Sequence, residues 1–160
     1  MGGLDPPGDA GGGVRAGPAV DLPERPHRDD TTRVDRQRIS SGTAFETRVG
    51  YSRAVRVGRH VWVAGTAPIM PEDADPPPGA YEQAQVCIGI VERALAEAGA
   101  KLDDVVRTRI YLMSADDIDE VGRAHAEAFG RARPATTGLV TGLLDPRWRV
   151  EIEAEAVISR

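Results

Sequence analysis

The sequence predicts an α+β domain in which a mixed sheet carries two helices on one of its faces. Three observations predict this class. Some segments alternate apolar and polar residues, two others place apolar residues at three- and four-residue spacing, and the order along the chain is β-β-α-β-α-β. A length of 160 residues suits a single domain with its own core.

Residues 1–37 differ in composition from the rest of the chain. They contain 7 of the 18 glycines and 5 of the 12 prolines, and no aromatic residue. Such a segment buries too little apolar surface to offset the conformational entropy lost on folding. We therefore expect a disordered tail over 1–37 and a folded domain over 38–160.

Two short strands begin the predicted domain, over residues 53–57 and 60–66. Gly58 and Arg59 form a two-residue turn between them, so we expect a hairpin. The next segment, 67–79, contains three consecutive prolines, which neither a helix interior nor a central strand accepts. We expect it to be a loop.

The apolar pattern then changes to helical spacing. A stripe of apolar residues predicts a helix of about five turns, which Gly99 ends. A second helix is expected over 116–129, with Ser114 or Asp116 as its cap and Gly130 at its end. The buried stripe of the first helix comprises Ala84, Cys87, Ile88, Val91, Ala94, Leu95 and Ala98, and that of the second comprises Val121, Ala124, Ala128 and Phe129.

Three further segments are expected to be extended. Residues 104–112 alternate as a strand, and Pro134 begins an extended piece that reaches about Thr141. The last strand, 149–158, shows the clearest two-residue period in the chain.

The strand faces that turn away from the helices carry charged side chains. Glutamates occupy alternate positions of 149–158, and two arginines and a tyrosine occupy alternate positions of 104–112. If these strands are neighbours, their side chains form a ladder on the open face of the sheet. A solvated face and a face docked on another subunit, with carboxylates in an interfacial cleft, are both open interpretations. The ladder comprises Glu151, Glu153, Glu155, Arg107, Arg109 and Tyr111.

Composition argues against several classes of function. The formal net charge of −5, with Lys101 as the single lysine, disfavours a protein that binds nucleic acid. No apolar run approaches the roughly 20 residues of a membrane-spanning helix, and no secretory signal is recognisable. Cys87 is expected to be a buried thiol, and His27, His60 and His125 lack metal-ligand spacing. We expect a cytoplasmic protein with no metal, no cofactor and no membrane partner.

Five segments together resemble the Rid family of reactive-intermediate deaminases, also called YjgF. They follow the order and spacing of that family over nearly all of 38–160. The resemblance implies a chorismate-mutase-like α+β fold, assembled as a homotrimer with sheets inward and a small-molecule site in each cleft between subunits. It also implies hydrolysis of enamines and imines to a keto acid and ammonia. The segments are GYSRAVRVGRHVWVAGTAPI (50–69), AYEQAQ (80–85), LAEAGAKLDDVVRTRIYL (95–112), FGRARPATT (129–137) and VEIEAEAV (150–157).

The resemblance also assigns roles to individual residues. Tyr51 corresponds to the site tyrosine, and Glu151 corresponds to the glutamate that places or activates water. The arginine that holds the substrate carboxylate in the family is replaced by Thr136, so Arg109 and Arg133 are the candidates for a substitute anchor. The substrate-binding set comprises Gly65, Ala64, Thr136, Thr137, Gly138, Arg109 and Arg133.

Three functions remain as alternatives. The first is a hydrolase or tautomerase that acts on a small imine, enamine or keto compound without the usual carboxylate. The second is a non-catalytic trimer that binds a metabolite or a partner enzyme, because Thr136, Ala64 and Gly138 make the pocket smaller and less charged. The third, RNA cleavage, is disfavoured by the negative charge and the lack of a basic patch with interleaved aromatic residues. Whether the loop 67–79 closes over the cleft is left open.

Overall fold

The computed structural model describes residues 35–159, which contain a six-stranded sheet. The strand order is β1-β2-β3-β6-β4-β5. Neighbouring strands are antiparallel except for β4 and β5, which run parallel, so the sheet is mixed as predicted. The strands are β1 (Arg36–Ile39), β2 (Ala54–Val57), β3 (His60–Thr66), β4 (Val105–Leu112), β5 (Ala135–Val140) and β6 (Val150–Val157).

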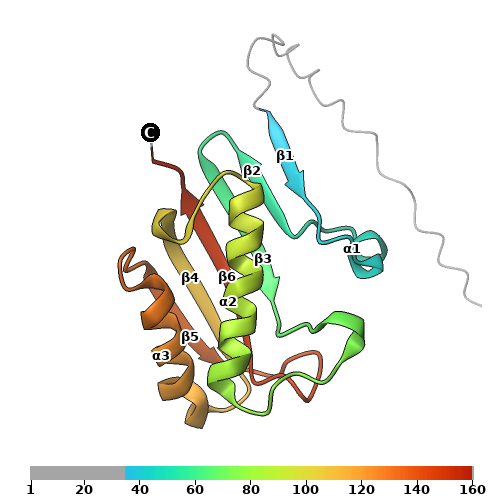
Figure 1. Cartoon of the computed structure of the whole chain (residues 1–160), viewed down its shortest axis with the longest axis vertical. Helices are drawn as coiled ribbons and strands as arrows, with labels where there is room; N and C mark the ends of the chain where they lie inside the picture. The colour runs from blue at the N-terminus through green and yellow to red at the C-terminus, as the bar shows by residue number, and fades with distance from the viewer. Residues whose placement is uncertain (1–34, 160) are drawn as a thin grey trace, which may run out of the picture. The chain divides into compact units, whose positions relative to one another are not determined.

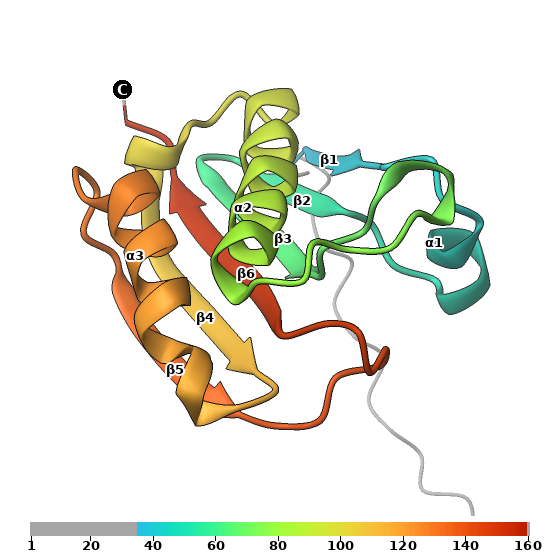
Figure 2. The same ribbon diagram turned by 60° about the horizontal axis from the view of Figure 1, so that its bottom comes forward.

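Two long helices cover one face of this sheet, as Figures 1 and 2 show. Helix α2 (Ala80–Glu97) packs on β3 and β6, and α3 (Ile118–Phe129) lies beside it on the β4–β5 side. Both helices and the α+β class are therefore confirmed. No helix within 35–159 is long and apolar enough to cross a membrane. The shorter elements are helix α1 (Ala44–Val49) and the 3₁₀ turns η2 (Pro71–Asp73), η3 (Leu102–Asp104) and η4 (Ala115–Asp117).

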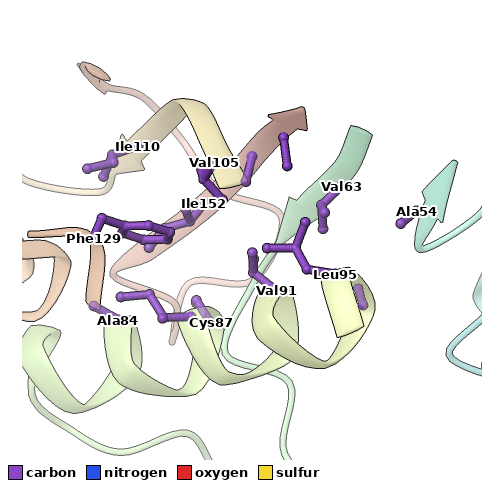
Figure 3. Close-up of a cluster of buried hydrophobic side chains, with 14 of the residues drawn as sticks. Ala54, Val63, Ala84, Cys87, Val91, Leu95, Val105, Ile110, Phe129 and Ile152 are labelled. Carbon is purple, nitrogen blue, oxygen red and sulfur yellow. The ribbon is translucent and has the colours of Figure 1, made fainter. Parts of the chain in front are cut away.

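The hydrophobic core lies between the two long helices and the sheet (Figure 3). The predicted stripe of α2 is buried along its whole length because every third or fourth side chain faces β3 and β6. From the other side, alternate residues of β6 point into the same layer, with Ile152 at its centre. Phe129 closes the layer under α3.

Two predicted turns are confirmed at glycines with positive φ angles. Gly58 has a φ of +59° in the β2–β3 hairpin, and Gly99 has a φ of +77° after the end of α2. L-residues with a Cβ rarely adopt this left-handed conformation, whereas glycine does so without steric cost. The predicted cap lies one element earlier: the Ser114 hydroxyl accepts from the Asp116 amide at 3.2 Å and caps the 3₁₀ turn η4, whereas the N-cap residue of α3 is Asp117, which makes no side-chain cap hydrogen bond.

The sequence did not predict β1 or α1, and it counted the 134–141 segment only as an extended piece. That piece is β5, a full member of the sheet. Strand β1 begins at Arg36, two residues before the predicted start of the domain, and buries only Ile39. The rest of the predicted tail lies outside the described residues. With four residues in β1 and six in α1, neither segment carries a periodic signal.

Helix α1 is held in place by the buried carboxylate of Glu46. This carboxylate accepts hydrogen bonds from the Ser40 hydroxyl at 2.5 Å and from the amide and hydroxyl of Ser41 at 2.9 and 2.6 Å. Burial alone would raise the pKa of Glu46, but these hydrogen bonds and the nearby Arg53 guanidinium outweigh it, and the pKa is lowered. Tertiary contacts of this kind stabilise a helix too short to form alone.

The buried centre of β6 gives a direct test of the core. Ile152 is 0% exposed, so Ile152→Ala leaves a cavity and should lower the free energy of unfolding by about 2–5 kcal/mol. Ile118, which is 47% exposed, is the matched control, and Ile118→Ala should change the stability by less than about 1 kcal/mol. Urea unfolding measures both variants. Equal losses in the two would contradict the placement of the core.

Candidate functional site

The predicted ladder is present on the face of the sheet that the helices leave open. Arg109 Nη1 lies 2.8 Å from a Glu153 oxygen and 3.1 Å from a Glu155 oxygen. The Tyr111 hydroxyl donates to the same Glu153 oxygen at 2.9 Å. The guanidinium of Arg109 is therefore already matched by two carboxylates. The register of β4 on β6 pairs Arg107 with Glu155, Arg109 with Glu153 and Tyr111 with Glu151.

Strand β3 carries a β-bulge where it pairs with β6. Between Val63 and Thr66, β3 contains one residue more than the stretch of β6 opposite it. In this stretch the two residues Ala64 and Gly65 of β3 lie opposite a single residue of β6, Glu153. Bulges redirect side chains and are frequent beside functional sites. The carbonyl oxygen of Gly65 accepts a hydrogen bond from Arg53 Nη2 at 2.6 Å.

A cavity of about 600 Å³ lies at this bulge. Its walls include two loops that are distant in the sequence, 67–76 after β3 and 144–148 before β6. In Figure 1 these loops, drawn in green and in orange-red, come together below the sheet. The residues that line the cavity include Phe45, Tyr51, Arg53, Ala64, Gly65 and Glu151.

The side chain of Gln83 ties the two loops together. It is buried at the start of α2, where its Nε2 donates to the carbonyl oxygens of Pro77 at 2.8 Å and Arg147 at 2.9 Å. Its Oε1 accepts from the Arg149 amide at 2.7 Å. A second link is the ion pair of Arg147 with Asp75, at 2.7 Å. The buried amide therefore fixes the cavity walls relative to the helix that supports them.

Glu151 places a half-buried carboxylate in the cavity, directly over Gly65. A Cβ atom at residue 65 would overlap the Glu151 Oε1 atom, so only glycine fits there without a shift. Burial raises the pKa of Glu151, the nearby Glu153 adds to the rise, and the Arg53 guanidinium opposes it. A carboxyl group with a raised pKa beside a cavity is a candidate for taking up and releasing a proton.

Four of the residues predicted for the site meet at this cavity. The Tyr51 ring packs edge-to-face on Phe45 with 6.0 Å between ring centroids, and the guanidinium carbon of Arg53 lies 5.8 Å from the Tyr51 ring centre. These contacts fix the tyrosine ring at the wall of the cavity. The four residues are Tyr51, Ala64, Gly65 and Glu151.

The other five predicted residues do not reach the cavity within one chain. Thr136 lies on the helix-facing side of β5, where its hydroxyl is 2.9 Å from the Thr108 hydroxyl, and Gly138 shares this side. Thr137 faces the opposite side, and Arg133 occupies the turn before β5 with a φ of +46°. Strand β4 separates β5 from β6. The five residues are Arg109, Arg133, Thr136, Thr137 and Gly138.

Arg53 is a cavity residue that the sequence did not reveal. It is only 5% exposed and precedes β2. The one available signal was the pair Ala64-Gly65 inside a strand, since a small residue and a glycine there are typical of a bulge. A bulge frees a carbonyl oxygen that needs a donor, but nothing in the sequence says which side chain supplies it.

The comparison with known families decides the chain's membership. The family model described as Endoribonuclease L-PSP matches residues 41–158. The chain belongs to this family. An uncharacterized protein of Streptomyces coelicolor is 42% identical over 125 residues, which cover 75% of this chain and 90% of that protein.

Other members of the family support the resemblance to the YjgF or Rid group. The crystal structure of a YjgF-family member from Mycobacterium tuberculosis matches with a TM-score of 0.71 and 44% identity, covering 78% of this chain and 100% of that chain. A protein of Mus musculus named 2-iminobutanoate/2-iminopropanoate deaminase is 29% identical over 123 residues, covering 76% of this chain and 91% of that protein. The predicted family is confirmed.

The contact between Gly65 and Glu151 can be tested by adding one methyl group. Gly65→Ala should push the carboxylate out of its half-buried position, so that the pKa of Glu151 falls toward its ordinary value. A ¹³C NMR titration of the Glu151 carboxyl group measures this. Gly142→Ala is the control, because open space surrounds Gly142. A pKa of Glu151 unchanged by Gly65→Ala would show that the glycine does not position the carboxylate.

The raised pKa of Glu151 also predicts how stability depends on pH. The folded state keeps this proton at pH values where the unfolded chain, with a glutamate pKa of about 4.3, has lost it. Stability therefore falls as the pH rises from the unfolded pKa through the folded one. Glu151→Gln has no proton to lose at this position, so its stability does not fall with pH in this way. The variant should therefore melt at a higher temperature than the parent chain at neutral pH, and the difference between the two melting temperatures should be smaller near the pKa of glutamate in the unfolded chain.

Thermal unfolding at several pH values measures this difference. Glu92→Gln, at an exposed position of α2, is the control and should change the melting temperature at neither pH. A Glu151→Gln variant less stable than the parent chain at neutral pH would contradict the cost assigned to this buried carboxylate.

Proposed function

We propose that this protein is a hydrolase or tautomerase of small imines, enamines or related keto compounds, with Glu151 as its acid–base residue. The observation that carries the proposal is the half-buried carboxylate over Gly65, in a cavity large enough for a small molecule. Burial raises its pKa, which suits a group that must both take and return a proton. The mouse relative named as an iminobutanoate deaminase supports this reaction class.

In the proposed hydrolysis, Glu151 takes a proton from a water molecule while the water oxygen bonds to the imine carbon. Glu151 then delivers this proton to the nitrogen, giving an amino alcohol. In the second half, the carboxylate takes the hydroxyl proton and returns it to the leaving nitrogen. A carbonyl group forms and ammonia leaves, so one water is consumed. Tyr51, at the cavity wall, polarises the substrate.

We further propose that the site is completed in a homotrimer, where β5 of one subunit meets the cavity of the next. Every residue of β5 is exposed in the single chain, including Leu139 at 53% and Val140 at 58%. On the open face, Trp62 lies opposite Glu155 and is also exposed. Large exposed apolar side chains are typical of surfaces that association buries. The β5 residues that would then join the site are Thr136, Thr137 and Gly138.

A non-catalytic trimer that binds a small metabolite is the alternative. It is supported by Ala64 at the cavity, which offers no hydroxyl group, and by Thr136, whose hydroxyl is already engaged with Thr108. Cleavage of RNA, the activity in the description of the family model, is not part of the proposal. A net charge of −5 opposes the approach of a polyanion.

A coupled assay tests the catalytic proposal. An amino-acid oxidase generates imines, semicarbazide traps what remains, and active protein lowers the amount trapped. Glu151→Gln should reduce turnover by roughly 10²–10⁴-fold, because the acid–base group is lost while the cavity shape is kept. Glu92→Gln is the control and should keep full activity. Ligand binding without turnover in either the parent chain or Glu151→Gln would establish the non-catalytic alternative.

A further inference from the structure

The cavity at the β3 bulge is larger than the chemistry proposed for Glu151 requires. Its volume of about 600 Å³ falls within the range of about 300–1,000 Å³ found for sites that bury drug-sized ligands. The proton transfers proposed for Glu151 concern only a C=N or C=O group and one water molecule. The remaining space is therefore available to a part of the ligand that does not react, and its lining shows the chemistry of that part.

Aromatic side chains are concentrated at this cavity. The chain has only two Phe, two Trp and three Tyr residues, and Phe45, Tyr51 and Trp148 line this one cavity. Phe45 belongs to α1, Tyr51 precedes β2 and Trp148 precedes β6. Because these segments are distant in the sequence, the fold and not local composition brings the three rings to the same place.

Large aliphatic side chains continue the apolar wall. Ile69 and Leu144, one from each of the two loops, line the cavity and are exposed, Leu144 at 83%. Exposed apolar side chains that gather at one place are typical of a surface that a ligand or partner covers. The residues that β5 of a neighbouring subunit is proposed to add are threonines and a glycine. Their small side chains would leave this apolar wall to a ligand.

The backbone on both sides of Trp148 is held by the buried side chain of Gln83. The Nε2 of Gln83 donates to the carbonyl oxygen of Arg147 at 2.9 Å, and its Oε1 accepts from the amide of Arg149 at 2.7 Å. The Trp148 amide itself donates to the carbonyl oxygen of Asp145 at 3.0 Å. The main chain that carries the indole ring is therefore fixed before any ligand binds.

Phe45 is held from the other side of the cavity. Its neighbour Glu46 ties α1 to the preceding segment through three hydrogen bonds to its carboxylate. The guanidinium carbon of Arg48 lies 4.9 Å from the centre of the Phe45 ring, and the Tyr51 ring packs against its edge. Rings that are already positioned lose little conformational entropy when a ligand binds.

We propose that these walls select a ligand with an aryl group, which packs against Phe45 and Trp148 while the reacting carbon lies beside Glu151. The inference rests on the proposed function for the reacting group and adds the class of substrate, an aryl-substituted imine, enamine or keto compound. Edge-to-face and offset-stacked contacts between rings add to the free energy gained by burying apolar area. Aromatic walls therefore favour an aryl group over a saturated group of equal size.

Titration of the full chain with three ketones, followed by NMR shifts of the backbone amides, tests this selection. Phenylacetone, cyclohexylacetone and butanone share the CH₂–CO–CH₃ group and carry an aryl ring, a saturated ring of the same size or a methyl group. Phenylacetone should bind about two- to tenfold more tightly than cyclohexylacetone, because of the contacts between rings. It should bind at least about tenfold more tightly than butanone, because it buries more apolar area.

Substitutions that keep an apolar wall but remove a ring identify the residues responsible. Trp148→Leu and Phe45→Leu should each bring the affinities for phenylacetone and cyclohexylacetone closer together. Tyr81→Leu is the control and should keep the full preference, since Tyr81 lies outside the cavity lining and its hydroxyl donates to Glu127 of α3. Equal affinities for the two ring compounds in the parent chain, or a preference that survives both Trp148→Leu and Phe45→Leu, would overturn the proposal.

A second measurement needs no variant. The chain has two tryptophans, so its NMR spectrum contains two indole N–H signals. Phenylacetone should shift the signal of Trp148 through the ring current of the bound aryl group and leave that of Trp62, which is not among the lining residues, in place. A Trp148 signal that does not move at saturating phenylacetone would contradict the proposal.

The two proposals fail in different ways. Binding of phenylacetone that depends on Trp148, without turnover of any imine, would support the aryl selection and overturn the catalytic proposal. Turnover of the imines made from phenylalanine and from alanine with equal kcat/KM, unchanged in Trp148→Leu, would overturn the aryl selection and leave the catalytic role of Glu151 in place.

Discussion

The extra residue of β3 at Ala64-Gly65 is the constraint on which the site depends. It breaks the regular pairing with β6 and leaves the Gly65 carbonyl oxygen to be satisfied by Arg53. The absence of a Cβ at Gly65 leaves room for the Glu151 carboxylate. One backbone irregularity therefore places a cation and an anion at the same cavity without letting them pair directly. A regular strand would provide neither the space nor the free acceptor.

The cavity beside this bulge is built from a rigid central strand and from loops whose side chains can vary. Glu151, the proposed acid–base residue, belongs to a central strand whose other face is packed in the core, so its position is tightly determined. The outer walls are loops, which Gln83 joins through three hydrogen bonds to backbone groups. Because those bonds go to main-chain atoms, the loop side chains are free to vary and to set which ligand fits.

The sequence predicted the elements whose patterns are long and periodic, and the charged ladder followed from the two-residue period of β4 and β6 alone. It did not predict β1 or α1, because a single buried side chain or one buried carboxylate such as Glu46 leaves no periodic signal. Arg53 was missed because its role arises from a bulge in another strand. The proposed contribution of Thr136 would depend on a neighbouring chain, whose position a single sequence does not contain.

The single cysteine gives the protein an internal reporter of its own opening. Cys87 is completely buried on α2, and burial together with the nearby Glu151 raises the pKa of its thiol. A protonated thiol that no reagent can reach does not react while the fold is closed. The rate at which a thiol-specific dye labels the chain therefore measures how often the layer between α2 and β6 separates, without any engineered probe.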